Sequence, residues 1–333
     1  MGTKEIKNKA AELGYAGCGV IPSEVFGEYE KFLKERVEAF PESRGLYEPM
    51  YDFIRPPAEC RSIVVCIRGL TNYRVPESLN GRIGKTYLFD NRVNYSNDCR
   101  HRSEFRAYLE MSGLCILPFT APSRWAAAKA GLGKFGNNNF IYHPEHGSNI
   151  KIEAYAVDKT LEYDDAPEDM LLGCDSNCGR CAAACPTGAL SDAFNMDHGR
   201  CVTHLNTFNG EVPERELRDK MGAWLYGCDV CQDVCPHNKK IPAGTEEYPL
   251  LSLLEELLTL ENILGLDEKT YRNVIFKRFW YAGSDGLWLW KLNALRAMIN
   301  SGEKKYDRTI ENCLSNEDAR LRAVAGERFW TDR

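Results

Sequence analysis

The sequence contains no apolar run that approaches the roughly 18 residues needed to cross a lipid bilayer. Its opening stretch, MGTKEIKNKAAELGYAGCGVIP, also lacks the basic, apolar and small-residue order of a secretory signal peptide. Ile6 stands where a myristoylation signal requires Ser or Thr. These absences lead us to expect a cytoplasmic protein without a membrane anchor.

Histidine is scarce, with 6 residues, whereas cysteine is abundant, with 14. The 333 residues are 44% hydrophobic and 27% charged, which is an ordinary globular balance and enough chain for two or three domains. A cytosolic compartment keeps thiols reduced, so clustered cysteines there more often bind metal or carry out redox chemistry than form disulfides.

Eight of the cysteines are organised around an internal repeat. The segments CGRCAAACP (178–186) and CDVCQDVCP (228–236) share the pattern C-x2-C-x3-C-P. One further cysteine precedes each segment, Cys174 before the first and Cys201 before the second. A zinc site needs two thiolate pairs around one ion and has no use for a third close cysteine followed by proline, so we consider zinc the weaker alternative.

Two [4Fe-4S] clusters do require this arrangement, because three close thiolates hold one cluster and the cysteine before proline reaches across to the other. We therefore predict two swapped ligand sets: Cys174, Cys178 and Cys181 with Cys235, and Cys201, Cys228 and Cys231 with Cys185.

Two of these ligands depart from the usual spacing. Cys174 and Cys178 are separated by three residues instead of two, and Cys201 is remote from its partners. If Cys174 does not reach its cluster, that cluster would be a three-iron form or take another ligand. The other cysteines are scattered, and we expect them to be buried free thiols: Cys18, Cys60, Cys66, Cys99, Cys115 and Cys313.

The part of the chain before the cysteines mixes helical and strand patterns. Apolar residues recur at helical spacing in 3–14 and in 23–40, where Ser23 is the expected N-cap. SIVVCIRG (62–69) is typical of a buried strand, and KIEAYAV (151–157) alternates like a half-buried one. The pattern predicts an α/β domain over residues 1–165.

The rest of the chain divides into two further predicted domains. Residues 166–245 form a ferredoxin-like double-cluster domain, and 246–333 form an all-α, HEAT-like domain of stacked helical pairs, with leucine-rich helical patterns at 249–264, 286–300 and 307–329. Residues 269–333 hold 13 Lys and Arg against 8 Asp and Glu, a net charge of +5. This bias favours a solvated helical surface, with contact to a phosphate backbone as the alternative.

A glycine-rich turn follows the helical stretch PSRWAAAKA. Gly131, Gly133 and Gly136 permit close approach of the backbone to a ligand, and they also suit a tight turn between a helix and a strand. Because the turn follows a helix and not a strand, it does not favour a nicotinamide cofactor.

Together these motifs resemble the epoxyqueuosine reductase family, and more distantly the corrinoid reductive dehalogenases. The resemblance rests on the α/β front, the double-cluster segment and several short stretches: GLGKFGNN (131–138), the GS and strand of 147–158, RCVTHLN (200–206), GCDVCQDVCPHN (227–238) and IFKRFW (275–280). It implies a cobalamin held against the α/β domain, two [4Fe-4S] clusters that supply it with electrons, and reduction of an epoxide on a modified tRNA base.

The resemblance also implies where the cofactor is bound. We expect cobalamin-binding residues at Gly131, Gly133, Gly136, Asn137 and Ser148. No D-x-H-x-x-G motif is present, which fits the base-off binding of the family. An external low-potential donor of the ferredoxin or flavodoxin type would reduce the clusters.

The chain departs from the family at the expected proton donor. The family carries an aspartate in a V-D-[ST]-x-P stretch, whereas residues 118–122 read PFTAP, which places Phe119 at the acid's position. An ungapped alignment places Leu117 there instead, and the carboxylate is lost in either case. Opening an epoxide requires a proton on oxygen, so another donor or another substrate is needed. The polar stretch 87–102 offers Tyr95 first and Asp98 next, with Arg124 as a basic partner. Asn137 also replaces a lysine of the family.

Three functions remain open from the sequence. The leading one is a cobalamin-dependent iron–sulfur reductase that acts on an organic substrate, in the manner of a reductive dehalogenase if that substrate is a small molecule. The second is a true epoxyqueuosine reductase that acts on tRNA, which the basic tail favours and the lost aspartate opposes. The third is a non-catalytic electron carrier with two clusters and no corrin, which leaves the large front domain without a role.

Overall fold

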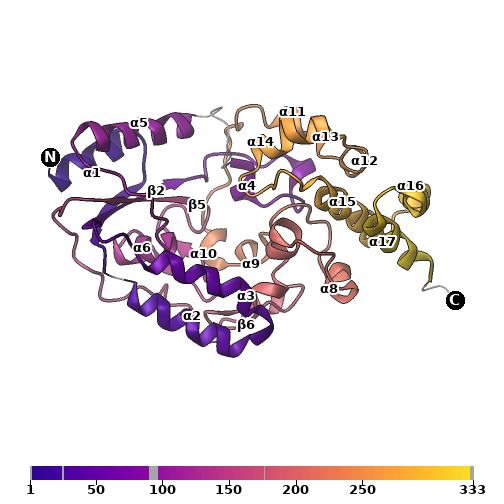
Figure 1. Ribbon diagram of the computed structural model, residues 1–333, viewed down its shortest axis with the longest axis horizontal. Coiled ribbons are helices and arrows are strands. Elements are labelled where there is room, and N and C mark those ends of the chain that lie inside the picture. Colours follow the sequence, from indigo (N-terminus) through magenta and orange to yellow (C-terminus); the bar gives the residue numbers. More distant parts are fainter. Residues whose placement is uncertain (1, 25, 90–96, 176, 331–333) are drawn as a thin grey trace.

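A three-stranded antiparallel sheet forms the centre of the N-terminal region (Figure 1). The computed structural model describes residues 2–24, 26–89, 97–175 and 177–330. The sheet order is β1 (Gly17–Pro22), β2 (Ser62–Gly69) and β5 (Ile150–Val157), with β2 in the middle. Both strands predicted from the sequence are confirmed, and β2 has the predicted bounds.

Helices cover both faces of this sheet, as Figure 1 shows. Val64 and Cys66 of β2 face a core shared with α1 (Thr3–Glu12) and α5 (Asn97–Met111). Ile63, Val65 and Ile67 face the opposite core, to which α6 (Ser123–Lys129) contributes Ala126 to Ala128. Because successive side chains of a strand point to opposite faces, coverage of both faces explains why residues 63–67 are all apolar and why the whole run 62–68 is buried.

The second helix begins later than the sequence predicts. It is α2 (Gly27–Ala39), and Ser23 is not its N-cap. The Ser23 hydroxyl instead donates a hydrogen bond to the carbonyl oxygen of Cys60 at 3.2 Å. Short helical segments complete this region: η1 (Pro41–Ser43), α3 (Arg44–Tyr47), η2 (Glu48–Ile54), η3 (Glu77–Leu79) and α4 (Lys85–Phe89).

The cysteine-rich segment consists of short elements around the two repeated motifs. A small hairpin, β3 (Lys134–Phe135) with β4 (Ile141–Tyr142), comes before it. The elements of the segment itself are α7 (Arg180–Ala184), β6 (Leu190–Asp192), β7 (Asn195–Met196), η4 (His198–Arg200), the π-helical η5 (His204–Phe208), α8 (Arg215–Lys220), α9 (Val230–Asp233) and α10 (Pro236–Lys239).

The described C-terminal segment, from residue 252 to residue 330, is helical. Its elements are α11 (Ser252–Leu257), α12 (Leu260–Leu264), α13 (Glu268–Thr270), η6 (Tyr271–Ile275), α14 (Phe276–Arg278), α15 (Leu287–Ser301), η7 (Lys304–Tyr306), α16 (Asp307–Asn312), η8 (Cys313–Ser315) and α17 (Ala319–Trp330). Its core also takes in Leu70, Leu79, Ile83 and Phe89 from the N-terminal region, so the tail shares its core with the front of the chain. Among the described helices, none has both the length and the apolar character required to span a membrane.

The scattered cysteines follow the sequence prediction only in part. Cys60, Cys66 and Cys313 are buried free thiols, as expected. Cys115 is exposed and Cys18 is half-buried, so the prediction was wrong for Cys115. The side chain of Cys99 lies outside the described part of the chain.

Candidate iron–sulfur and cofactor site

The first group of cysteines surrounds a single cavity of about 200 Å³. Its lining contains the thiols of Cys174, Cys178 and Cys181 from the first motif together with Cys235 from the second. The three-residue spacing after Cys174 therefore does not remove that thiol from the group. A sequence-distant cysteine that joins three local ones is the swapped arrangement required by two neighbouring cubane clusters.

The second group of cysteines, Cys185, Cys201, Cys228 and Cys231, is recognised because the charge of each thiol affects the pKa of its neighbours. Burial is the main cause that raises the pKa of Cys228 to about 12, and the charges of Asp229, Cys201 and Cys185 also contribute. Burial also raises the pKa of Cys231, with further contributions from Cys228, Cys201 and Cys185. Four thiols that disfavour one another's ionisation lie close together, and a cationic iron core would remove that penalty.

The alternative of a single-ion site does not fit this geometry. The cysteines instead surround a cavity, which suits a multi-atom cluster better than a tetrahedral zinc ion. Pro236, which follows Cys235, begins α10, where its missing N–H costs no helical hydrogen bond.

The predicted glycine-rich turn lies directly against the first cysteine group. Gly136 and Asn137 line the 200 Å³ cavity. A Cβ atom added to Gly133 would come within 2.5 Å of Cγ2 of Ile141, and one added to Gly136 within 2.6 Å of Cε2 of Tyr142. Close packing of the β3–β4 hairpin thus requires glycine at both positions. Gly131 has φ +69° at the end of α6. Cobalamin contact by these residues stays a prediction.

Two polar side chains connect this turn to the second motif. The Asn138 amide nitrogen donates to the Tyr142 hydroxyl at 2.9 Å and to the carbonyl oxygen of Cys231 at 3.2 Å. The Tyr142 hydroxyl lies close to the Cys235 thiol, and burial together with that thiol raises the pKa of Tyr142. The turn therefore contacts the peptide that carries ligands of both predicted clusters.

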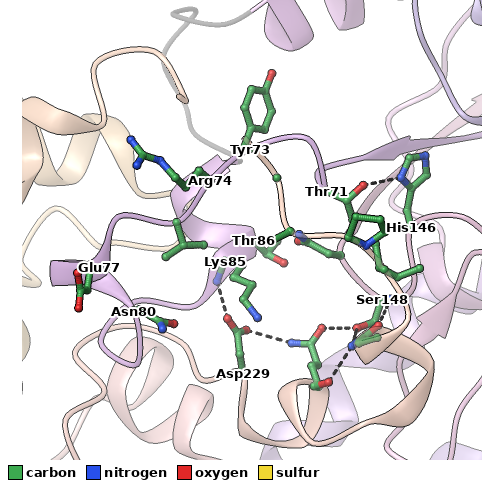
Figure 2. Close-up of a pocket in the computed structure, with 18 residues that line it drawn as sticks. Thr71, Tyr73, Arg74, Glu77, Asn80, Lys85, Thr86, His146, Ser148 and Asp229 are labelled. Atoms are coloured by element: carbon green, nitrogen blue, oxygen red, sulfur yellow. Dashed lines mark hydrogen bonds between the residues drawn. The ribbon is translucent and has the colours of Figure 1, made fainter. Parts of the chain in front are cut away.

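A larger cavity of about 460 Å³ lies between the N-terminal region and the second motif (Figure 2). Ser148, one of the predicted cofactor residues, lines it and donates from Oγ to the Gln232 side-chain oxygen at 2.8 Å. The Asn238 amide donates in turn to the Ser148 hydroxyl at 2.8 Å. A volume of this size is in the range of small-molecule sites, which span about 300–1,000 Å³.

Asp229 closes the same polar network. Its carboxylate accepts hydrogen bonds from the Lys85 backbone N–H at 2.7 Å and from the Gln232 amide at 3.1 Å. Burial raises the pKa of Asp229 to about 6, against the lowering effect of the Lys85 charge. Asp229, Gln232 and Asn238 all lie in the quoted GCDVCQDVCPHN motif, but sequence reasoning assigned roles only to its cysteines.

Several histidines are partly or fully buried, although their loop-like, polar sequence context is typical of surface residues. His146 lines the larger cavity and its Nδ1 is hydrogen-bonded to the Thr71 hydroxyl at 2.7 Å. His204 is buried, and burial lowers the pKa of His198 to about 4. Their burial depends on packing between segments that are distant in the sequence, which local context does not reveal.

The predicted catalytic residues are described unevenly. Tyr95 lies outside the described residues, and Asp98 belongs to α5 but its side chain is not among those described. Arg124 on α6 donates from Nη1 to the carbonyl oxygen of Asn139 at 2.6 Å. Phe119 packs against the apolar core on one face of the sheet.

Comparison with known proteins agrees with the cysteine geometry. Residues 173–238 match the family "4Fe-4S double cluster binding domain". The epoxyqueuosine reductase of Cellulophaga algicola is 29% identical over 315 residues, which cover 85% of this chain and 97% of that protein. The epoxyqueuosine reductase of Bacillus cereus is 37% identical over 145 residues, 42% of this chain but only 37% of the relative.

Solved structures extend the likeness to the fold of nearly the whole chain. A crystal structure of epoxyqueuosine reductase superposes with a TM-score of 0.80 at 22% identity, and covers 97% of this chain and 88% of that one. A second, of epoxyqueuosine reductase with a tRNA-Tyr epoxyqueuosine-modified stem loop, gives a TM-score of 0.79. The protein thus contains a 4Fe-4S double cluster binding domain, and its resemblance to the epoxyqueuosine reductase family is confirmed in sequence and in fold.

Proposed function

We propose that the protein is an iron–sulfur reductase of the epoxyqueuosine reductase type, in which two [4Fe-4S] clusters pass electrons to a base-off cobalamin that reduces an organic substrate. The observation that carries this proposal is the separation of eight cysteines into two groups that each combine both motifs. Cys174, Cys178, Cys181 and Cys235 would bind one cluster, and the other four would bind its neighbour.

The larger cavity suits the cofactor in its chemistry. It is lined by side-chain amides and hydroxyls, among them Asn80, Thr86, Ser148 and Asn149, which can hydrogen-bond to the amide groups of a corrin. It also contains Asp229, next to Cys228, so a group bound there would lie beside the peptide that holds a cluster. Cobalamin would supply a metal centre able to reduce carbon, while the protein binds, orients and excludes water.

The proposal also has several finer features. The cofactor domain spans residues 1–165, the cluster domain 166–245 and the HEAT-like helical domain 246–333. A ferredoxin or flavodoxin reduces the clusters. The protein works in the cytoplasm. Tyr95 is the first candidate for the proton donor and Asp98 the next, with Arg124 as the basic partner. Gly131, Gly133, Gly136, Asn137 and Ser148 contact the cofactor.

A second candidate is reduction of epoxyqueuosine in tRNA itself. It is favoured by the fold that this chain shares with the stem-loop complex of an epoxyqueuosine reductase. Phe119 at the position of the family's acid opposes it, because a phenyl ring donates no proton.

Oxygen-free protein reconstituted with iron, sulfide and cobalamin tests the proposal. We expect about one cobalt per chain and turnover of an epoxide substrate that depends on both cofactors. Iron without cobalt would favour an electron carrier. A gel shift with an epoxyqueuosine-bearing stem loop tests the tRNA candidate, since binding through phosphates weakens steeply as salt rises.

A further inference from the structure

Two arginines from different helices converge on one asparagine near the second cysteine group. Arg36 of α2 donates from Nη2 to the Asn139 side-chain oxygen at 2.5 Å, and Arg124 of α6 donates to the Asn139 carbonyl oxygen at 2.6 Å. Asn139 adopts φ +65°, a left-handed conformation that asparagine tolerates better than most residues. The two guanidinium groups are close enough that Arg124 lowers the pKa of Arg36, after burial as the main cause.

The positive charges of Arg36 and Arg124 are not balanced by an acidic partner in the described part of the chain. Neither guanidinium forms an ion pair with a described carboxylate. Asp197 is the nearby acid, and its Oδ1 accepts hydrogen bonds from the Ser43 hydroxyl at 2.6 Å and from the Gly199 N–H at 3.0 Å. Two like charges held close together repel each other, and an anion bound between them would remove that cost.

Several nitrogen atoms around the arginines are buried and have no hydrogen-bond partner among the described residues. They are Nε of Arg36, Nδ2 of Asn139 and Nδ1 of both His198 and His204. Asn139 and His204 are more than nine-tenths buried, with 7% and 8% of their surface exposed. Unpaired buried polar groups are costly, and so many in one place point to a missing ligand.

The residues around Asn139 extend from the interior to the protein surface. Arg124 is exposed and Arg36 is half-buried, whereas Asn139 and His204 lie inside. His198 and His204 are in contact, with ring centroids 4.8 Å apart, and Cys201 lies between them in the sequence. A ligand could therefore enter at Arg124 and lie close to the predicted second cluster.

We infer that Arg36, Arg124, Asn139, His198 and His204, here called the arginine cluster, bind the oxyanion of a small organic substrate, either a carboxylate or a phosphate. The planar guanidinium fork matches the two oxygens of such a group, and Asn139 adds a neutral donor. In naming the anion as part of a substrate, this inference rests on the proposed reductase function; the binding itself does not.

Calorimetric titration of the oxygen-free, cluster-loaded protein tests the site, with inorganic phosphate and acetate as probes and chloride to hold ionic strength constant. We expect saturable binding that weakens at least about tenfold in Arg36→Gln and in Arg124→Gln, the loss associated with one charge-assisted hydrogen bond. The matched control is Arg106→Gln, which alters an arginine on α5 paired with Glu110 and should bind as the parent does.

Iron content and thermal unfolding of each variant show whether it has folded. If Arg36→Gln does not fold, the exposed Arg124→Gln decides the matter. No saturable binding to the parent protein, or equal affinity in Arg124→Gln, would overturn the inference. It is also overturned if Arg124 affects only the binding of a tRNA stem loop, or only the cluster's visible spectrum. A sample without iron refutes the reductase proposal and leaves the phosphate result to be judged separately.

Discussion

Asn293 joins the helical tail to the cluster segment, and its replacement gives a quantitative test of that contact. This side chain is 2% exposed on α15 and donates from Nδ2 to the carbonyl oxygens of Asn206 at 2.9 Å and Leu225 at 3.0 Å. Asn206 in turn donates to the carbonyl of Gly227 at 2.9 Å and accepts from its N–H at 3.0 Å. Gly227 directly precedes Cys228, so the network ends beside a predicted cluster ligand.

Asn293→Ala removes two hydrogen bonds and leaves two buried carbonyl groups without this donor. Each bond contributes about 1 kcal/mol, and an unsatisfied buried acceptor costs about 1–3 kcal/mol, so we expect a loss of about 2–4 kcal/mol in the free energy of unfolding. Asn300→Ala on the same helix is the control. Asn300 also bonds two carbonyls, of Arg218 and Gly222, but it is half-buried and water can replace it, so we expect about 1 kcal/mol or less.

Urea unfolding under oxygen-free conditions provides the assay, followed by tryptophan fluorescence and by the visible absorption of the clusters. The Asn293 variant should unfold at distinctly lower urea than the Asn300 variant, and the two signals should change together because the network couples tail and clusters. Equal midpoints for the two variants, or cluster loss well before the change in tryptophan fluorescence, would refute the reasoning.

Three further predictions concern the site. Swapped ligation predicts that the double variant Cys235→Ser, Cys181→Ser loses one cluster, whereas the double variant Cys235→Ser, Cys228→Ser loses both. Electron paramagnetic resonance and iron content measure these losses. If each motif held its own cluster, the first variant would lose both clusters and the second only one. Because burial lowers the pKa of His198 to about 4, the folded state favours its neutral form. Stability should therefore fall as pH drops from about 6.5 toward 4, and unfolding curves of His198→Gln should lack that part of the pH dependence. Finally, the alignment that places Phe119 at the position of the family's aspartate predicts that Phe119→Asp raises the rate of epoxide opening about 10²-fold or more, whereas unchanged turnover would show that another donor acts.

Local patterns predicted the elements that their own residues determine. SIVVCIRG has the bounds of β2, because an unbroken β-branched run allows little else in a doubly covered sheet. The strand β1 went unpredicted, since GCGVIP contains two glycines and ends in proline, and only pairing with β2 makes it a strand. Its existence depends on residues some 45 positions away in the sequence.

The candidate site, like the fold, was predicted from the sequence only where neighbouring residues determine it. Cysteine spacing predicted the two mixed groups, because ligand geometry limits which thiols can share a cluster. The arginine cluster was not predicted from the sequence, because Arg36 and Arg124 lie far apart in the chain, and only Arg124 was named there, as the basic partner of the proton donor. The shared core between residues 70–89 and the tail was hidden for the same reason, since leucine patterns indicate a buried face but not its partner.

The central claim is that eight thiols hold two iron–sulfur cubanes, and the most direct test is a count of iron and inorganic sulfide in protein prepared without oxygen. Two [4Fe-4S] clusters predict about eight of each per chain. Zinc in their place, or iron without sulfide, would contradict the account.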